Sequence, residues 1–310
     1  MTTGTVPNFL VAGAARCGTT GLVEGLRAHP QVFVTQPKEP HYFALHGRGA
    51  DFEGPGDSGT INRVAVTNRA DYLALYPQEH CYLALGDGSV STLYYFEESL
   101  PEILRLNPEM RLIILLRDPV ERAYSSHQYM RARGFEPHED FLAAVREEPR
   151  RRAENWHHIW HYTQMSLYAE SIAAVQAALP PEQIGIWFYD DLDRDYDETL
   201  QQILRFLDVP LIEGQTGSIP RVNISGQPRF APLHSGISWA TRNDSLRRAV
   251  KRSTTYRFRE RIRRYTLQRE GITEEARVIL TPLFSEDLRL LRSLLSGDVP
   301  RWLQPGGERH

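Results

Sequence analysis

The sequence contains few cysteines and no long apolar run. Among its 310 residues the cysteines are Cys17 and Cys81, which cannot form a disulfide framework and so favour a reducing compartment. No segment approaches the roughly 18 consecutive apolar residues that a membrane-spanning helix requires. The residues before Phe9 lack the basic segment that opens a secretory signal. We therefore expect a cytoplasmic protein.

An excess of one charge is also missing. The chain has 36 Lys and Arg residues against 39 Asp and Glu, a net charge of -3 that indicates no particular partner. It contains neither an internal repeat nor a long low-complexity segment. With 41% hydrophobic residues, a chain of this length can bury a large core in one large domain or two.

Short apolar runs alternate with segments of helical periodicity over the first two thirds of the chain. The predicted strands are 8–12, 32–34, 81–85, 111–116 and 184–188. The predicted helices are 18–28, 69–76, 97–106, one that begins at Pro119 or Val120, 139–146, 164–179 and 198–207. This order predicts an α/β fold, a doubly wound parallel sheet flanked by helices.

No strong strand is expected after Pro210. We predict a single domain over 1–310, with a core of about 8–210 followed by a C-terminal loop and helical extension of about 211–310.

An anion-binding loop is predicted in the segment 9–20, which reads FLVAGAARCGTT. Gly13 and Gly18 stand where a P-loop has its glycines, so backbone N–H groups and a helix N-terminus can meet an anion. The P-loop lysine is absent because Thr19 occupies its position, and Arg16 is the basic residue of the loop. This P-loop-like cradle suits an anion shorter than a triphosphate.

Acid–base candidates occur in the segment 36–43, which reads QPKEPHYF. Its two prolines fix the course of the chain, so Lys38, Glu39 and His41 are expected on a stiff loop. A second candidate region follows the buried run 111–116. Ligands of open α/β sheets bind beyond the carboxyl ends of the strands, where Arg117 stands in this chain.

Two stretches together resemble the two nucleotide-binding signatures of PAPS-dependent sulfotransferases, where PAPS is 3′-phosphoadenosine 5′-phosphosulfate. They are FLVAGAARCGTTGLVEGLRAHPQVFVTQPKEPHYF from Phe9 and RLIILLRDPVERAYSSHQY from Arg111. The resemblance is nearest to the branch that includes heparan sulfate sulfotransferases and bacterial small-molecule and glycolipid enzymes. It implies transfer of a sulfuryl group from PAPS to an acceptor, with no metal.

The resemblance also implies which residues hold the donor. The 5′-phosphosulfate would lie on Ala14, Ala15, Arg16, Cys17, Gly18, Thr19 and Thr20. Arg117 and Ser125 would hold the 3′-phosphate with a charged fork and a hydroxyl. Arg221 or Arg229 in the late loop could reach over the nucleotide.

Four residues are implied in the transfer step. Glu39 matches the glutamate that serves as the base in heparan sulfate-type enzymes, and His41 is an alternative base or a substrate contact. Arg16 stands where those enzymes have a lysine, and arginine stabilises charge without giving up a proton at neutral pH. Lys38, beside the base, is therefore a candidate proton donor to the leaving group.

The sequence does not distinguish a small-molecule acceptor from a glycan or a lipid, but a hydroxyl is favoured over an amine as the attacking group. It does not indicate the oligomeric state either. The stretch 156–162 carries His157, His158 and His161 between aromatic residues, and packing or an acceptor wall is favoured over a metal site. The basic stretch 242–269 could be a solvated face, attract an anionic acceptor or contact an anionic membrane. Nucleic-acid binding is disfavoured because no base-stacking module accompanies this charge.

Two other classes of function fit parts of the pattern. A P-loop kinase or nucleotide hydrolase would bind ATP with Mg²⁺, which the absent lysine disfavours. A non-catalytic nucleotide- or glycan-binding relative would keep the fold, and the altered cradle at Arg16 is a mild indication of this class.

Overall fold

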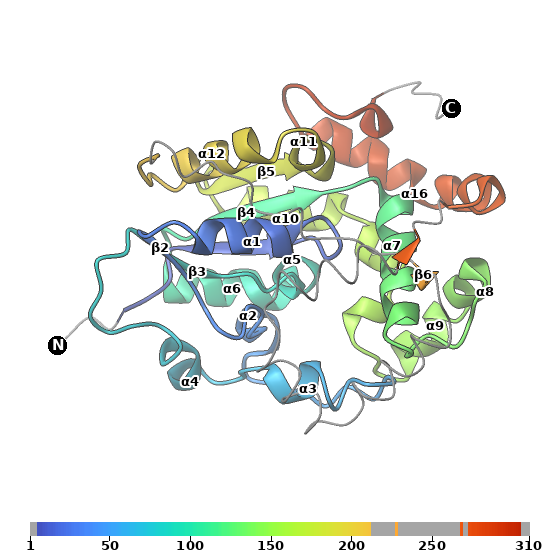
Figure 1. Ribbon diagram of the computed structural model, residues 1–310, viewed down its shortest axis with the longest axis horizontal. Helices are drawn as coiled ribbons and strands as arrows, with labels where there is room; N and C mark the ends of the chain where they lie inside the picture. The colour runs from blue at the N-terminus through green and yellow to red at the C-terminus, as the bar shows by residue number, and fades with distance from the viewer. Residues whose placement is uncertain (1–4, 212–226, 229–266, 269–271, 305–310) are drawn as a thin grey trace.

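A parallel five-stranded sheet forms the centre of the protein (Figure 1). The computed structural model describes residues 5–211, 227–228, 267–268 and 272–304. The strands are β1 (Phe9–Gly13), β2 (Val32–Val34), β3 (Ala84–Asp87), β4 (Arg111–Leu116) and β5 (Ile184–Phe188), in the order β2-β3-β1-β4-β5. This confirms the predicted parallel α/β sheet.

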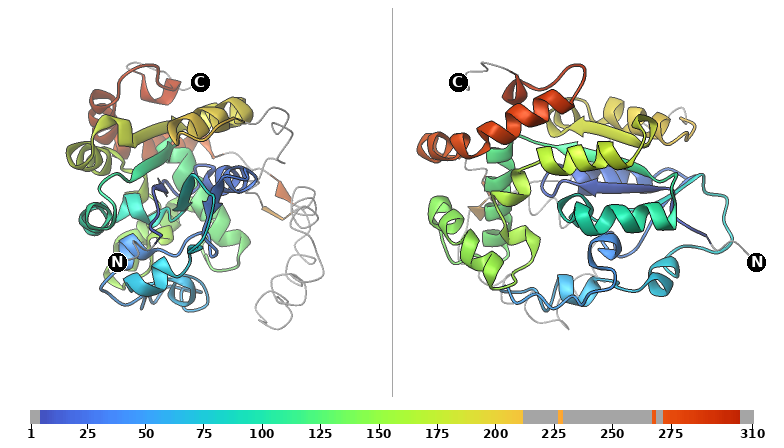
Figure 2. Two further views of the ribbon diagram at one scale, coloured as in Figure 1. Left: turned by 90° about the vertical axis from the view of Figure 1, so that its left-hand side faces the viewer. Right: turned by 180° about the vertical axis from the view of Figure 1, so that it is seen from behind.

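The central strands are apolar because helices cover both faces of the sheet. All five residues of β1 are buried, as are five of the six in β4. The helices α1 (Thr19–Arg27) and α12 (Tyr196–Phe206) contact each other on one face, where Figure 1 shows α1 in front of the sheet. The opposite face carries α5 (Ser91–Tyr94), α6 (Phe96–Leu106) and α10 (Ala169–Ala178), as the right view in Figure 2 shows.

The carboxyl ends of the strands face a group of further helices. The helix α7 (Pro119–Ala132) stands across these ends at the right of Figure 1. A second apolar cluster joins it to α8 (Phe141–Arg146), η1 (His158–Trp160) and α16 (Glu274–Leu294). The other helices of the described residues are α2 (Tyr42–Leu45), α3 (Ile61–Val64), α4 (Arg69–Leu73), α9 (Glu148–Ala153), η2 (Gln164–Ser166), η3 (Pro181–Gln183), α11 (Tyr189–Arg194) and η4 (Arg301–Leu303).

Several predicted elements have different bounds in the structure. The helix predicted over 164–179 is divided into η2 and α10, because the backbone N–H groups of Tyr168 and Ala169 donate to Asp287 at 2.9 Å each. The strand predicted over 81–85 is β3, which begins three residues later and ends two residues later. The helix predicted from Glu139 begins at Phe141, after the Asp140 cap.

The structure describes the C-terminal part in separate segments. They include the helix α16, as the predicted helical extension requires, and an antiparallel pair of two-residue strands that was not predicted, β6 (Gln227–Pro228) and β7 (Leu267–Gln268). Arg221, Arg229 and all but two residues of the stretch 242–269 lie outside the described residues, so their predicted roles stay predictions. The single-domain division likewise stays a prediction.

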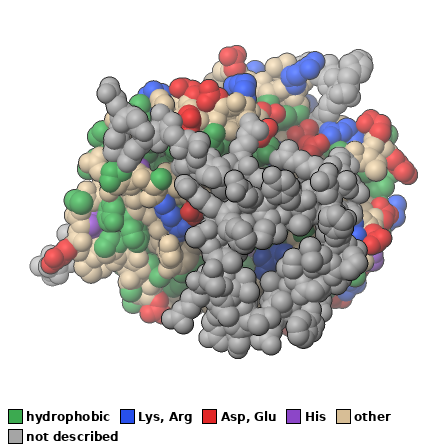
Figure 3. All heavy atoms as spheres, in the orientation of Figure 1, with side chains coloured by type: hydrophobic (Ala, Val, Ile, Leu, Met, Phe, Trp, Pro, Cys, Tyr) green, Lys and Arg blue, Asp and Glu red, His purple; other side chains and the backbone are tan. Residues whose placement is uncertain are grey.

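The surface of the described residues carries both signs of charge. On the face drawn in Figure 3, acidic and basic side chains lie interspersed around the residues that are not described. Within the described ranges, no helix combines the length and the apolar character needed to cross a membrane.

Candidate functional site

The cradle connects the end of β1 to the start of α1. Gly18 caps α1 with a left-handed backbone, φ 87°, and a Cβ placed there would lie 2.6 Å from Leu192 Cδ2. Both facts require glycine at this position. Glycine also brings no side chain to the N–H groups of the first helical turn, which begins with Thr19 and Thr20, so an anion can approach them.

Two cradle residues have an interior role. The Ala14 N–H donates to the Leu115 carbonyl at 2.8 Å, so this amide anchors the loop to β4 and is not available to an anion. Cys17 is buried, and burial raises the pKa of its thiol to about 11. Its thiol is therefore protonated at neutral pH and is no nucleophile.

Arg16 lies beside Arg117 and Ser125. Its Nε donates to Ser125 Oγ at 3.3 Å, and its guanidinium stacks 4.5 Å from the centre of the Tyr129 ring. The Arg16 carbonyl accepts a hydrogen bond from Arg117 Nη1 at 3.2 Å. The structure thus brings together three residues that were predicted from two separate signatures.

Arg117 is held at the carboxyl end of β4. Its guanidinium stacks 4.5 Å from the centre of the Tyr189 ring and lies 3.5 Å from a Glu121 carboxylate oxygen. The Tyr168 hydroxyl donates to the Arg117 carbonyl at 3.0 Å. At the start of α7, Asp118 accepts from the N–H groups of the second and third helical residues at 2.9 and 3.1 Å. This cap fixes the helix that carries Ser125.

Sequence reasoning missed the tyrosines that support these arginines. Tyr129 follows Ser125 by four residues in one helix, a spacing that places both on one face and could have identified it. Tyr189 directly follows β5, at the same edge of the sheet as Arg117. No comparable signal exists for Tyr168, because its position depends on the break between η2 and α10.

Lys38 and Glu39 lie on the other side of the cradle. Lys38 Nζ is 2.7 Å from Glu39 Oε1 and donates to Thr19 Oγ1 at 3.4 Å. The Lys38 side chain passes over Gly88, where a Cβ would lie 2.9 Å from Lys38 Cε. The ammonium therefore points to the N-terminus of α1.

Glu39 is suited to accept a proton. Its side chain is 30% exposed, so a ligand can reach it. Burial acts to raise the pKa of Glu39, but the Lys38 ammonium and hydrogen bond outweigh it and the pKa lies below the ordinary carboxyl value. Glu39 is thus a carboxylate at neutral pH.

His41 is a buried, neutral residue behind this pair. Its backbone N–H donates to Ser89 Oγ at 3.0 Å, and its ring Nδ1 lies 2.8 Å from Ser91 Oγ. Burial lowers the pKa of His41 to about 4, although the Glu39 charge opposes this. Its backbone is left-handed, with φ 58°. These contacts hold the loop that carries Glu39.

The histidine-rich stretch forms an internal network. Asp57 is buried and accepts from His157 Nδ1 at 2.6 Å and from Trp160 Nε1 at 3.2 Å. The His158 ring lies 5.8 Å from the His41 ring. Since Trp160 has no exposed surface, it packs and cannot contact an acceptor. Over the residues described, no group of three His, Cys, Asp or Glu side chains is placed to hold a metal ion.

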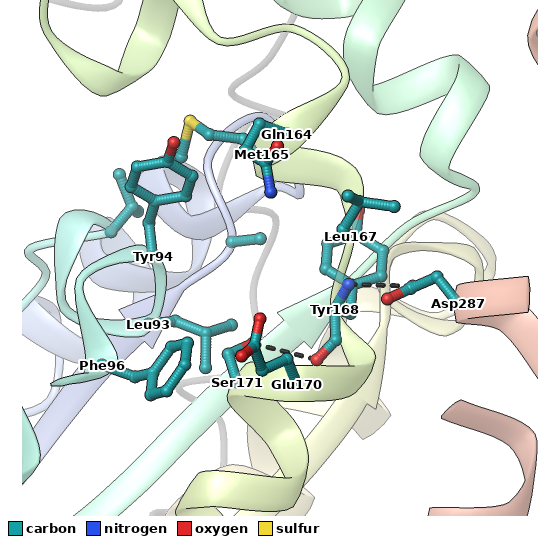
Figure 4. A pocket seen from close by; sticks show the side chains of 12 residues that line it. Leu93, Tyr94, Phe96, Gln164, Met165, Leu167, Tyr168, Glu170, Ser171 and Asp287 are labelled. Carbon is teal, nitrogen blue, oxygen red and sulfur yellow. Dashed lines mark hydrogen bonds between the residues drawn. The ribbon is translucent and has the colours of Figure 1, made fainter. Parts of the chain in front are cut away.

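A cavity of about 150 Å³ lies behind the cradle, between α5 and α10 (Figure 4). Its lining includes Ala14, Tyr94, Met165, Glu170 and Asp287, and no lysine or arginine. An acidic and apolar lining does not suit an anionic nucleotide. The anion-binding groups described above lie in the cradle instead.

Comparison with known proteins identifies the family. A sequence profile described as the sulfotransferase family matches residues 7–213. The chain belongs to this family. Carbohydrate sulfotransferase 15 of mouse is 26% identical over 78% of this chain and 51% of the mouse protein, and the human protein matches to the same extent. The chain thus spans about half the length of these curated relatives.

A solved structure confirms the fold. The crystal structure of a sulfotransferase from Alicyclobacillus acidocaldarius aligns over 97% of this chain and 100% of its own, with a TM-score of 0.74 and 23% identity. This likeness confirms the predicted P-loop-like sheet, and the profile match confirms the predicted family.

Proposed function

We propose that this sulfotransferase moves a sulfuryl group from PAPS to an acceptor hydroxyl, with Glu39 as the base. The main support for the proposal is the placement of charged side chains on two sides of the cradle. The Lys38–Glu39 pair lies at one side of the α1 N-terminus, and Arg117 with Ser125 lies beside Arg16 at the other. A bisphosphorylated donor needs two anion sites, for which we propose the cradle at the α1 N-terminus and the Arg117–Ser125 pair.

The donor fits the groups that are present. The 5′-phosphosulfate is a compact anion that the amides from Ala15 to Thr20 and the N-terminus of α1 can hold without the P-loop lysine. Arg117 and Ser125 suit the 3′-phosphate. Arg229 stays part of the proposal as a residue that covers the nucleotide.

The transfer step follows from this placement. The acceptor oxygen attacks sulfur in line, the bond from sulfur to the bridging phosphate oxygen breaks, and 3′,5′-bisphosphoadenosine leaves. Glu39 takes the acceptor proton. Lys38 contacts both Glu39 and Thr19, so its ammonium can offset the charge that develops on the leaving oxygen or protonate it. Positioning and charge stabilisation do most of the work, as in phosphoryl transfer.

A glycan is the preferred acceptor class. The curated relatives are named carbohydrate sulfotransferases, and a sugar hydroxyl meets the requirement for a neutral nucleophile beside a carboxylate. A hydroxyl of a small molecule or a lipid satisfies the same chemistry. An amine acceptor is less favoured because it is protonated at neutral pH.

The Glu39→Gln protein tests the proposal. We expect it to bind 3′,5′-bisphosphoadenosine as the wild type does, since the proposed base acts on the acceptor and not on the nucleotide. Turnover of PAPS with a glycan mixture, measured as nucleotide release, should fall by about 10²- to 10⁴-fold. Glu97→Gln, on the first turn of α6, is the matched control and should keep full activity.

The results separate the competing functions. Wild-type turnover by Glu39→Gln would show that Glu39 is not the base. Binding of the bisphosphate without any turnover in the wild type would favour the non-catalytic class. Tight binding of ATP with Mg²⁺ in place of the bisphosphate would favour a P-loop kinase or hydrolase.

A further inference from the structure

The residues Asp57 and His157 form a hydrogen-bonded pair that has no part in the proposed transfer step. The Asp57 carboxylate is buried and accepts from Nδ1 and from the backbone N–H of His157 at 2.6 and 3.1 Å. It also accepts from the Gly54 N–H and from Trp160 Nε1 at 3.0 and 3.2 Å. Burial acts to raise the pKa of Asp57, but the hydrogen bonds from His157 and Trp160 bring it below the ordinary value. Asp57 is therefore a carboxylate at neutral pH and holds the Nδ1 proton of His157 toward itself.

This pairing leaves Nε2 as the ring nitrogen of His157 that can meet a ligand. The His157 side chain is 11% exposed, and within the described part of the chain its Nε2 has no hydrogen-bond partner. In the neighbouring His161 both ring nitrogens are engaged, by the Tyr94 hydroxyl at 2.8 Å and by the Trp156 carbonyl at 3.0 Å. His161 is thus structural, whereas His157 presents an open edge.

His157 lies between the loop that carries the proposed base and the helix α7. On one side, its ring centre is 5.3 Å from that of His158, which in turn is 5.8 Å from that of His41 in the base loop. On the other side, the Ser126 hydroxyl of α7 donates to the Ile159 carbonyl of η1 at 3.2 Å. The neighbours of His157 thus connect it to both sides of the cradle.

We propose that Nε2 of His157 binds a second hydroxyl of the acceptor, apart from the one that attacks sulfur, and thereby favours a glycan over a monohydroxyl acceptor. This inference rests on the proposed function. Nε2 accepts from a hydroxyl when the ring is neutral and donates to it when the ring is protonated, and a sugar hydroxyl suits either state. A monohydroxyl acceptor leaves this contact unmade, because its one hydroxyl is the nucleophile. Asp57 is the positioning residue, since it fixes the orientation of the ring.

Turnover of matched acceptors tests this assignment. The polyols are methyl galactoside and methyl glucoside, and the monohydroxyl acceptors are tetrahydropyranylmethanol and cyclohexanol. Release of 3′,5′-bisphosphoadenosine at saturating PAPS gives kcat and KM for each acceptor. In the wild type, kcat/KM for a glycoside should exceed that for either monohydroxyl acceptor by about 3- to 10-fold, the effect of one hydrogen bond.

His157→Asn removes Nε2 but keeps a donor for Asp57, because the Asn amide stands where the ring has Nδ1. The KM for the glycosides should rise by about 3- to 10-fold. The KM for PAPS, and kcat/KM for the monohydroxyl acceptors, should stay within about twofold of wild type. His157→Gln places its amide near the position of Nε2 and should restore most of the glycoside KM.

His80→Asn is the matched control. His80 is exposed, stacks on Tyr82 and precedes the amino end of β3, opposite to the edge of the sheet that carries the cradle. Its kinetic constants should equal those of the wild type for every acceptor.

The outcomes are distinct. Equal losses for glycosides and monohydroxyl acceptors in His157→Asn would give His157 a structural role only and overturn the inference, as would an unchanged glycoside KM or a wild type that sulfates no glycoside. If His157→Asn does not fold, as judged by circular dichroism, histidine-labelled wild type is studied by NMR. Methyl galactoside should then shift an imidazole nitrogen signal that cyclohexanol leaves in place, and the absence of that shift would overturn the inference. Failure of the wild type to bind 3′,5′-bisphosphoadenosine would instead overturn the proposed function itself.

Discussion

The contact between Lys38 and Glu39 controls the ionisation of the proposed base. The two side chains are 2.7 Å apart, and the ammonium lowers the pKa of Glu39 against the effect of burial. A base acts only when it is ionised. A low pKa therefore keeps Glu39 competent at neutral pH and down into the acidic range, at the cost of some basicity.

Lys38→Met should move the acid limb of the pH–activity profile to higher pH. Without the ammonium, burial is left as the main influence and raises the pKa of Glu39, so the carboxylate is protonated at a higher pH. The measurement is kcat/KM against pH with a saturating donor. Turnover should also fall, but the midpoint of the limb is the readout.

Lys38→Arg is the matched control for this change. It keeps the positive charge, so the acid limb should stay near its wild-type position even if the rate falls. An acid limb that is the same in Lys38→Met and in the wild type would show that a group other than Glu39 sets it.

The helix α7 connects the fold to the proposed donor site. Arg117 precedes it and Ser125 lies within it, so the placement of its first turn positions both residues. That turn is specified locally, by Asp118 as the cap and Pro119 as the first helical residue. Positioning by a cap predicts that stability and nucleotide binding are coupled at this element.

Asp118→Ala should lower the free energy of unfolding by about 1 kcal/mol, because two first-turn N–H groups lose their acceptor. It should also weaken binding of 3′,5′-bisphosphoadenosine. Asp140→Ala removes an equivalent cap from α8, whose N–H groups at Leu142 and Ala143 bind Asp140. Urea unfolding and calorimetry on both variants provide the measurement.

The two variants separate a local effect from a general one. Asp140→Ala should lose similar stability but bind the nucleotide normally, since α8 carries none of the proposed donor residues. Equal loss of affinity in both variants would show that binding follows stability alone and that α7 has no special positioning role.

Elements with a local signal were predictable from the sequence. The strands β1 and β4 are continuous apolar runs because they are covered on both faces, and α7 begins at Pro119, one of the two predicted starts. The break before α10 was not predictable, because its cap is Asp287, more than 100 residues away in the chain. Long-range capping leaves no trace in local periodicity.

The positions of the candidate site residues were also predictable from the sequence, whereas their side-chain contacts were not. The signatures place Arg16, Arg117 and Glu39 at the carboxyl edge of the sheet, where the structure has them. The direction of each side chain is a tertiary property. The contacts of Arg16 with Ser125 and of Lys38 with Thr19 depend on the order of the strands, which the motifs do not contain.

The residues of the candidate site come from both sides of the central strand β1. Because β1 lies between β3 and β4, the cradle is reached from the β2–β3 side by the proposed catalytic loop and from the β4 side by α7. In the proposed function, this separation gives the two phosphate groups of the donor separate positions around one loop. Buried histidines lie between the two sides, since the centre of the His41 ring is 5.8 Å from that of His158 in η1, and η1 shares an apolar cluster with α7.

Three buried histidines make the stability of the protein dependent on pH. Burial lowers the pKa of His41 to about 4 and that of His161 to about 3, and it holds the pKa of His158 well below the ordinary value. In the unfolded chain each histidine titrates near a pKa of about 6.5. The unfolded state therefore binds more protons than the native state below that pH, so stability is lost as pH falls from about 6.5 toward 4.

His161→Gln should flatten this dependence. One histidine that titrates only on unfolding contributes a slope of up to about 1.4 kcal/mol per pH unit, so the variant should lose that much of the slope of the unfolding free energy between about pH 6 and 4. Urea unfolding at several pH values measures it.

Tyr94→Phe is the control, because it removes the 2.8 Å hydrogen bond to His161 Nδ1 but keeps the titrating ring. It should be less stable at pH 7 with an unchanged slope, whereas a wild-type slope in His161→Gln would show that this ring is protonated in the folded protein.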